Sequence, residues 1–287
     1  MSSSRDIRRR IRSIGSTSQI TKAMQMVAAS KMRKAQEAAL AGRPFVRLIY
    51  RFQRAATTAS REFNHPLLEV RPVNKRAVIL VAADKGLCGA LNSNLFRMAA
   101  QFDPASTVFI TAGRKAAQFV AATRRQLIAE FAYGDSPTFP EARAIAAFAR
   151  DLFLKKEVDE VRVLATRFIN TLSQQPVSLE YLPVGEIKGL EIPGAEREVY
   201  ATDARETLFK PGPEAFLSYL LSHYLNIYIY QVLLNAKASE QSARMVSMKN
   251  ATDNAENLID DLKLEYNKLR QAGITKELLE IAGGQAS

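Results

Sequence analysis

Residues 211–279 read PGPEAFLSYLLSHYLNIYIYQVLLNAKASEQSARMVSMKNATDNAENLIDDLKLEYNKLRQAGITKELL, and this stretch decides the fold. After the proline-glycine-proline break at 211–213, nothing forbids one continuous helix, in which Gly273 is the only glycine. At a rise of about 1.5 Å per residue, that helix would be on the order of 100 Å long. Its apolar seam includes Leu217, Leu221, Tyr224, Ala251, Ala255, Leu258, Leu262 and Leu269. Because one helix cannot bury such a seam alone, a partner helix is predicted.

A second long helix is predicted at the other end of the chain. Ser4 is a suitable N-cap, Asp6 suits the first turn, and no proline follows until Pro44, where we expect a bend before helix resumes to about residue 61. The heptad seam of this helix comprises Ile7, Ile11, Ile14 and, after a phase shift, Ala28, Met32, Ala35, Ala39, Gly42, Val46 and Ile49. Its small residues let a partner approach closely. Residues 1–61 and 214–287 are therefore predicted to pair as an antiparallel coiled coil.

Residues 75–184 have the texture of an α/β domain. Strand-like runs at 77–81, 107–111, 160–165 and 177–182 alternate, over the first three, with helical patterns at 91–102, 114–124 and 140–154. Such alternation predicts a Rossmann-like domain with a largely parallel sheet. Residues 185–213 show no period and are predicted to form a loop beside the base of the coiled coil. The fold class is α/β, with a long antiparallel coiled coil of the N- and C-terminal helices plus this central domain.

The charge of the chain is concentrated near its start. Forty lysines and arginines face 29 aspartates and glutamates, which gives a formal net charge of +11. In the first 54 residues the only acids are Asp6 and Glu37, and the cations are Arg5, Arg8, Arg9, Arg10, Arg12, Lys22, Lys31, Arg33, Lys34, Arg43, Arg47, Arg51 and Arg54. This field attracts an acidic partner, whether nucleic acid, anionic lipid or protein. The Arg- and Ser-rich start also resembles an organellar transit peptide, but it runs unbroken into the helix, which favours a structural role.

Cysteine and histidine counts exclude several classes of protein. Cys88 is the only cysteine, and His65 and His223 are the only histidines. Intrachain disulfides are impossible and a Cys/His metal site is not expected. No apolar run reaches the roughly 20 residues of a membrane-spanning helix. The best run, 217–234, is interrupted by Ser, His, Asn and Gln, so a soluble or membrane-peripheral protein is expected.

Residues 85–89, KGLCG, stand where a dinucleotide fold cradles pyrophosphate, between a predicted strand and a predicted helix. The spacing is GxxG rather than GxGxxG, no acid ends the second strand, and a structural turn is the preferred interpretation. Cys88 lacks a nearby base and is interpreted as a small core residue. No carboxylate has a partner at a spacing typical of acid/base work. The sequence thus predicts no catalytic residue and no cofactor.

A cationic helix is also typical of a nucleic-acid-binding protein. The N-terminal arm, however, has no aromatic residue before Phe45, and its apolar seam occupies one face. A basic coiled-coil nucleic-acid-binding protein therefore stays open as an alternative, and a small-molecule enzyme built on the α/β domain is a third hypothesis.

Three stretches of the chain resemble the gamma subunit of F-type ATP synthases. ITKAMQMVAASK at 20–31 resembles the family's N-terminal signature, DKGLCGALN at 84–92 its first α/β turn, and SEQSARMVSMKNATDN at 239–254 with YNKLRQAGITKELL at 266–279 its C-terminal signature. Departures are mild: Lys85 and Ala90 stand where an arginine and a second glycine are usual, and Gly273 replaces a small helix former. With Cys88 as its only cysteine, the chain lacks the regulatory segment of the plastid form and resembles the bacterial type.

The resemblance implies a central rotor shaft that holds no catalytic site. The implied partners are three alpha and three beta subunits, the epsilon subunit and the c-ring, with no nucleic acid. Rotation of the c-ring, driven by protons, would turn the shaft and change the affinity of each beta subunit in turn. The implied location is the cytoplasmic face of the bacterial inner membrane, as a peripheral subunit.

The resemblance also implies which residues contact the beta subunits. In the first helix the candidates are Lys22, Met24, Lys31, Arg33 and Lys34, which would meet an acidic beta-subunit loop. In the last helix they are Arg244, Arg270, Gln271 and Thr275. The apolar tip formed by Leu278, Leu279 and Ile281 would turn inside a hydrophobic collar. Because rotation must break each contact repeatedly, weak exposed pairs of about 1 kcal/mol or less suit these positions.

Overall fold

The computed structural model describes residues 4–42, 65–184 and 212–284, without the side chains of 213, 214, 276, 277 and 280–284. Its contacts divide the chain into a sheet-bearing unit, Ala29–Ala243, and a terminal unit, Met1–Ala28 with Arg244–Ser287. Two helices belong to both units: α1, Ser4–Ala41, and α6, Pro213–Gly284. The predicted helix at 43–61, with Val46 and Ile49, lies outside the described residues, as does nearly all of the predicted loop at 185–213.

The sheet has five strands in the order β3-β2-β1-β4-β5. The strands are β1 (Arg76–Val81), β2 (Thr107–Ala112), β3 (Gln126–Phe131), β4 (Glu160–Phe168) and β5 (Gln174–Leu182). Neighbours are parallel except for β4 and β5, and Ile79 of β1 lies opposite Ile110 of β2 and Val163 of β4. The four predicted strands and the largely parallel sheet are confirmed. β3 was not predicted from the sequence, because an edge strand that is half exposed carries a weak apolar signal.

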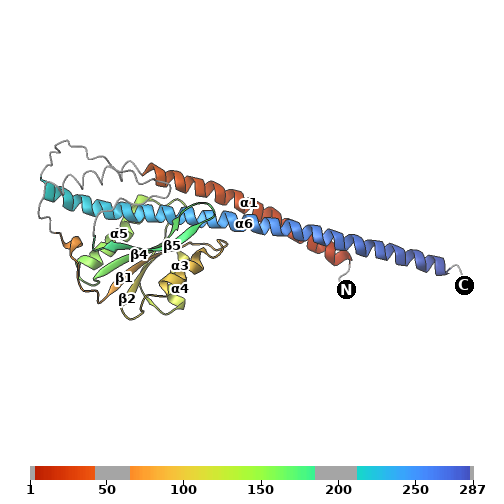
Figure 1. The fold of residues 1–287 in the computed structure, drawn as a ribbon, viewed down its shortest axis with the longest axis horizontal. Helices are drawn as coiled ribbons and strands as arrows, with labels where there is room; N and C mark the ends of the chain where they lie inside the picture. Colours follow the sequence, from red (N-terminus) through yellow and green to blue (C-terminus); the bar gives the residue numbers. More distant parts are fainter. Residues whose placement is uncertain (1–3, 43–64, 185–211, 285–287) are drawn as a thin grey trace. The chain divides into compact units, whose positions relative to one another are not determined.

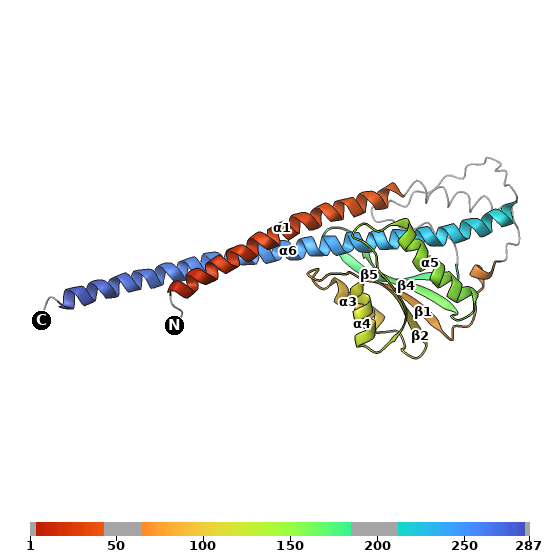
Figure 2. The same cartoon turned by 180° about the vertical axis from the view of Figure 1, so that it is seen from behind.

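Helices cover both faces of the sheet (Figure 1). One face packs against α3 (Leu91–Ala99) and α4 (Arg114–Ala122), and Figure 2 shows these two helices from behind. The other face packs against α5 (Phe139–Leu154), Leu67 of the short helix η1 (Pro66–Leu68) and the first part of α6. Leu225, Ile229 and Leu233 of α6 recur every four residues and are fully buried there.

Small residues on α1 face α6 inside the sheet-bearing unit. Ala35 packs against Ala238 of α6 and Phe168 of β4. Directly after α1, a Cβ at Gly42 would lie 2.3 Å from Nε2 of Gln231, so the Gln231 side chain occupies the space that glycine leaves. Later positions on α1 meet earlier positions on α6, so the two helices are antiparallel, as predicted.

The terminal unit shows the same antiparallel order. Thr21 and Thr252 share a hydroxyl hydrogen bond of 2.7 Å, and the Arg8 guanidinium donates to the Tyr266 hydroxyl. Ile7 is buried on α1, as the predicted seam required. The predicted coiled coil is therefore confirmed.

The assignment of one residue, Leu258, to the apolar seam of α6 was wrong. Leu258 is 47% exposed, whereas Ala255 and Leu262 are buried and Ile259 is half-buried. An α-helix has 3.6 residues per turn, so its buried stripe drifts from a strict heptad and here passes through Ile259. Gly273 does not interrupt the helix.

Candidate functional site

Polar residues gather in the loops that follow the parallel strands β1, β2 and β3. Parallel strands end at a common edge, so these loops lie together. The loop after β1 carries Asp84, the loop after β2 begins at Gly113, and the loop after β3 carries Tyr133 and Asp135. Doubly wound folds bind their ligands at this edge.

Gly113 joins two of these loops. Its φ of +96° suits glycine, and a Cβ there would lie 2.1 Å from the carbonyl oxygen of Ala82. In the next residue, the backbone N–H of Arg114 donates to Oδ1 of Asp84 over 2.9 Å. That carboxylate stands at the first turn of α4, where the helix dipole favours negative charge. The turn after β2 is thereby fixed against the loop after β1.

Tyr133 is the buried centre of the loop after β3. Its hydroxyl donates to the carbonyl oxygen of Ala82 over 3.0 Å. Burial, together with the charges of Glu240, Asp84 and Asp135, raises the pKa of this hydroxyl well above its usual range. Tyr133 therefore stays a neutral donor, and its ring is free to face a cation.

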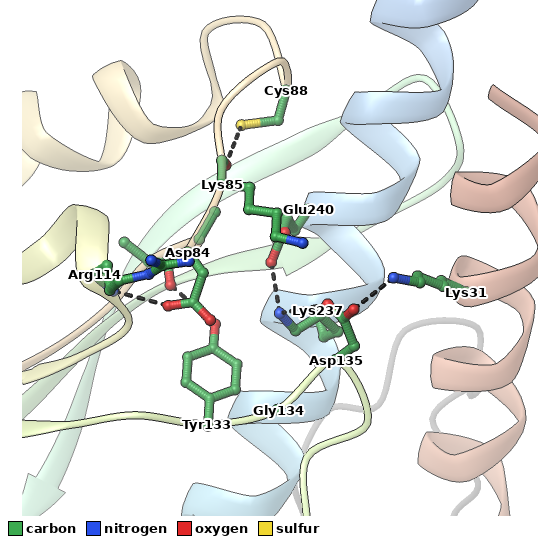
Figure 3. A network of polar contacts seen from close by, with 12 residues as sticks. Lys31, Asp84, Lys85, Cys88, Arg114, Tyr133, Gly134, Asp135, Lys237 and Glu240 are labelled. Atoms are coloured by element: carbon green, nitrogen blue, oxygen red, sulfur yellow. Dashed lines mark hydrogen bonds and ion pairs between the residues drawn. The ribbon is translucent and has the colours of Figure 1, made fainter. Parts of the chain in front are cut away.

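That cation is Lys237 of α6, which is 0% exposed. Its Nζ donates to Oε2 of Glu240 over 2.9 Å, lies 3.8 Å from Oδ1 of Asp135, and lies 4.7 Å from the centroid of the Tyr133 ring. Burying an ammonium group without partners is very costly, so these three contacts account for a lysine inside the protein. Figure 3 shows Lys237 between Glu240 and Asp135.

Asp135 also contacts the other long helix. Its Oδ2 accepts a hydrogen bond of 2.5 Å from Nζ of Lys31 on α1. This hydrogen bond, with the charges of Lys237, Lys31 and Lys85, lowers the pKa of the Asp135 carboxyl, which is therefore ionised at neutral pH. One loop of the α/β domain thus holds a lysine from each long helix, as Figure 3 shows. We call Lys31, Tyr133, Asp135, Lys237 and Glu240 the lysine joint.

The chemistry of the lysine joint suits holding rather than reacting. Its cations and carboxylates are paired with one another, and Lys237 is inaccessible to solvent. Within residues 4–42, 65–184 and 212–284, no group of His, Cys, Asp or Glu side chains could hold a metal ion.

In the loop before α3, Cys88 is buried, and its thiol lies 4.0 Å from the carbonyl oxygen of Lys85 and accepts from Asn92 Nδ2 over 3.6 Å. A structural turn, rather than a phosphate cradle, is consistent with this packing.

The predicted contact residues of α1 differ in their surroundings. Lys22, Arg33 and Lys34 are exposed, and Met24 is half-buried. Lys31 is half-buried and already engaged by Asp135, a partner that the sequence analysis did not foresee.

The predicted contact residues of α6 also separate into two kinds. Arg244 is 7% exposed, whereas Arg270, Gln271 and Thr275 are exposed, and the Thr275 hydroxyl donates to the Gln271 carbonyl oxygen over 3.0 Å. Near the end of the helix, Leu278 and Leu279 are 62% and 68% exposed. The side chain of Ile281 lies outside the described residues.

Most of the lysine joint was not predicted from the sequence: Tyr133, Asp135, Lys237 and Glu240. A local signal was present, because Lys237 interrupts an apolar run on α6 and has Glu240 three residues later, at ion-pair spacing. Its meaning depends on Asp135, which is distant in sequence and follows the strand that was also missed.

Comparisons with known proteins agree over the whole chain. A family model described as ATP synthase matches residues 3–287. The ATP synthase gamma chain of Opitutus terrae is 47% identical, over 99% of this chain and 98% of its own length, and that of Methylacidiphilum infernorum is 42% identical over 99% of both. The chain therefore belongs to a family of ATP synthase subunits. Within it, the chain is a member of the ATP synthase gamma chain family, of the bacterial type.

Solved structures support the fold. The rotor of the Euglena gracilis mitochondrial ATP synthase has a TM-score of 0.65 at 18% identity, covering 94% of this chain and 98% of that one. The central stalk and c-ring structure from Tetrahymena thermophila gives 0.59 at 24% identity, covering 81% and 99%. Among the described residues, no helix combines the length and apolar character that crossing a membrane requires.

Proposed function

We propose that this chain is the central rotor shaft of an F-type ATP synthase and has no catalytic site of its own. The observation that carries the proposal is the family match over residues 3–287, which includes both long helices and the sheet. The related structures are described as a rotor and as a central stalk with a c-ring. By this likeness the partners are alpha and beta subunits, three of each, an epsilon subunit and a c-ring.

The mechanism is a mechanical form of population shift. A catalytic site on a beta subunit changes its nucleotide affinity only as far as the shaft contacts its two states differently. The shaft must therefore present an asymmetric surface and must not twist loosely under load. Proton-driven rotation of the c-ring would supply the work, at the cytoplasmic face of the bacterial inner membrane.

The contact residues are proposed on the same basis. The exposed cations Lys22, Arg33 and Lys34 are available to acidic loops of the beta subunits. Arg270, Gln271 and Thr275 are exposed further along α6, and the exposed Leu278 and Leu279 suit a hydrophobic collar. Met24, Lys31 and Arg244 are more buried and would offer a beta subunit a smaller contact area.

The experiment is reconstitution from purified subunits. The chain is combined with alpha, beta and epsilon subunits and with membrane vesicles that hold the c-ring, and ATP hydrolysis and ATP-driven proton pumping are measured. We expect no hydrolysis by the chain alone and pumping only when the chain is present. Equal pumping by vesicles that lack the chain would contradict the proposal.

The alternative of a basic coiled-coil nucleic-acid-binding protein rested on the cationic first helix alone. The family match covers that helix together with the rest of the chain, so the alternative is set aside. Salt-sensitive binding of DNA by the purified chain, with log affinity falling steeply against log salt, would revive it.

A further inference from the structure

The sheet-bearing unit uses one carboxylate to hold both long helices. Asp135 accepts a hydrogen bond from Lys31 of α1 and lies 3.8 Å from the buried Nζ of Lys237 of α6. We propose that the lysine joint makes the α/β domain and the two helices turn as one body, so that Asp135, Lys31 and Lys237 are positioning residues for torque transmission. This inference rests on the proposed rotor function.

The polar contacts of α6 add an angular restraint to its apolar packing. The face of α6 that packs on the sheet is made of side chains such as Leu225, Ile229 and Leu233, and hydrophobic contact is non-directional. Hydrogen bonds and close ion pairs, in contrast, depend on angle. Polar contacts therefore add angle-dependent resistance to a load that twists the helix.

Those polar contacts hold α6 from two sides. Lys237 points to the loop after β3, whereas the Ser239 hydroxyl donates to the Thr166 carbonyl oxygen of β4 over 3.1 Å. At about 100° per residue, Lys237 and Ser239 lie about 200° apart around the helix axis. Rotation of α6 in either direction must therefore strain a contact on one side. One turn later, the Ser242 hydroxyl donates to the Thr171 carbonyl oxygen over 2.8 Å and strengthens the second side.

The first helix is held in a similar way. Lys31 reaches the loop after β3, and Ala35 packs against Phe168 at the end of β4. The β3 loop and β4 therefore contact both long helices.

Glu160 provides a matched control for Asp135. It accepts hydrogen bonds from Arg162 Nε, over 2.5 Å, and from Arg76, so it too is a carboxylate between two cations. Both of its partners lie on strands of the sheet, β1 and β4, and neither is on α1 or α6. Glu160→Gln therefore removes a comparable charge from the same unit without touching either long helix.

The experiment compares Asp135→Asn with Glu160→Gln in two measurements. In the full chain, hydrogen exchange of the amides in residues 29–41 reports how firmly α1 is held. In the reconstituted enzyme, the ratio of protons pumped to ATP hydrolysed reports torque transmission. We expect Asp135→Asn to speed exchange in that segment about two- to fivefold, as for loss of a half-exposed ion pair, and to lower the ratio. Glu160→Gln should change neither.

Lys31→Gln is the second variant, to be used if Asp135→Asn does not fold. It leaves the buried pair of Lys237 and Glu240 intact, so we expect it to fold. It should give the same two effects, in smaller measure. Unchanged exchange, or faster exchange with an unchanged pumping ratio, would overturn the proposal and leave the rotor function intact. A wild-type enzyme that hydrolyses ATP without pumping would refute the rotor function instead, and the exchange measurement would still decide whether the joint holds α1.

Discussion

The two units join the same pair of helices by different chemistry. In the terminal unit, the polar contacts between α1 and α6 include a hydroxyl pair, Thr21 with Thr252, and the contact of Arg8 with Tyr266. In the sheet-bearing unit, the contacts centre on the buried Lys237 and its carboxylate partners. The first arrangement sets hydroxyl and aromatic polar contacts beside buried apolar residues such as Ile7 and Leu262, and the second is a directional polar joint.

The difference matches the work proposed for each unit. A helix pair that turns past surrounding subunits gains from weak, exposed polar groups on its outer surface, since strong pairs with those subunits would hold it at one angle. A unit that receives torque needs contacts that resist twist. Four sets of substitutions test the difference between the two units.

Lys237→Met should have the largest effect on stability. The change leaves the buried Glu240 without its hydrogen bond from Lys237, and loss of one partner from a buried ion pair costs about 3 to 5 kcal/mol. The control is Lys263→Met on the same helix, where the pair with Asp260 is exposed and the expected cost is below about 0.5 kcal/mol. Denaturant unfolding of both variants measures the difference. Equal, small costs would show that the joint does not stabilise the unit.

Gly113→Ala should be the next most damaging change. The new Cβ would meet the Ala82 carbonyl oxygen at 2.1 Å, and a φ of +96° strains any L side chain. We expect a loss of about 1 to 3 kcal/mol, together with faster hydrogen exchange at Tyr133 and Asp135. Thermal unfolding with exchange mass spectrometry tests both. A variant as stable as the wild type would mean that the loop can shift without cost.

Reversal of Lys22, Arg33 and Lys34 to glutamate should change coupling rather than folding. These side chains are exposed, so the free energy of unfolding should shift by no more than about 0.5 kcal/mol. Repulsion from acidic beta-subunit loops should shift the relative energies of the rotor's resting angles by about 1 to 3 kcal/mol. Lys31 is left unchanged because it belongs to the joint. Proton pumping beside ATP hydrolysis in membranes is the measurement. Wild-type values for both rates would show a solvated face without a mechanical role.

Gly273→Ala should act in the opposite direction to Gly113→Ala. Gly273 lies inside α6 with no atom within 4 Å of the position a Cβ would take, so alanine gains helix propensity without a clash. The expected gain is about 0.5 to 1 kcal/mol. Far-ultraviolet circular dichroism during thermal unfolding should show a small rise in the stability of the helix. A loss of stability would indicate that the terminal unit requires glycine there.

Most of the fold could be predicted from the sequence because its signals are local and long. The apolar stripe of α6 and the runs of β1 and β2 repeat over many residues, and small residues such as Ala35 mark the seam directly. β3 was not predicted because an edge strand is apolar on little of its surface. Leu258 was misplaced because the buried stripe of a real helix drifts from the heptad.

The site was harder to predict for a physical reason. The local sequence shows only that Lys237 interrupts an apolar run three residues before Glu240, and only the fold brings Asp135 from a distant loop to within 3.8 Å of its ammonium group. Lys31 was expected to face outward for the same reason, since its family motif says nothing of its intrachain partner. Buried ion pairs are properties of the tertiary structure, so motif and periodicity carry little signal for them.

The most direct test of the rotor function is to observe rotation. Leu172 is 82% exposed at the turn between β4 and β5, and the native Cys88 is buried, so Leu172→Cys offers a site for attaching a bead. The chain is assembled with alpha and beta subunits that are fixed to glass, and the bead is followed as ATP is added. We predict rotation in one direction, in three steps per turn, that stops when ATP is removed. Continued ATP hydrolysis by the assembled complex with a stationary bead would contradict the rotor function.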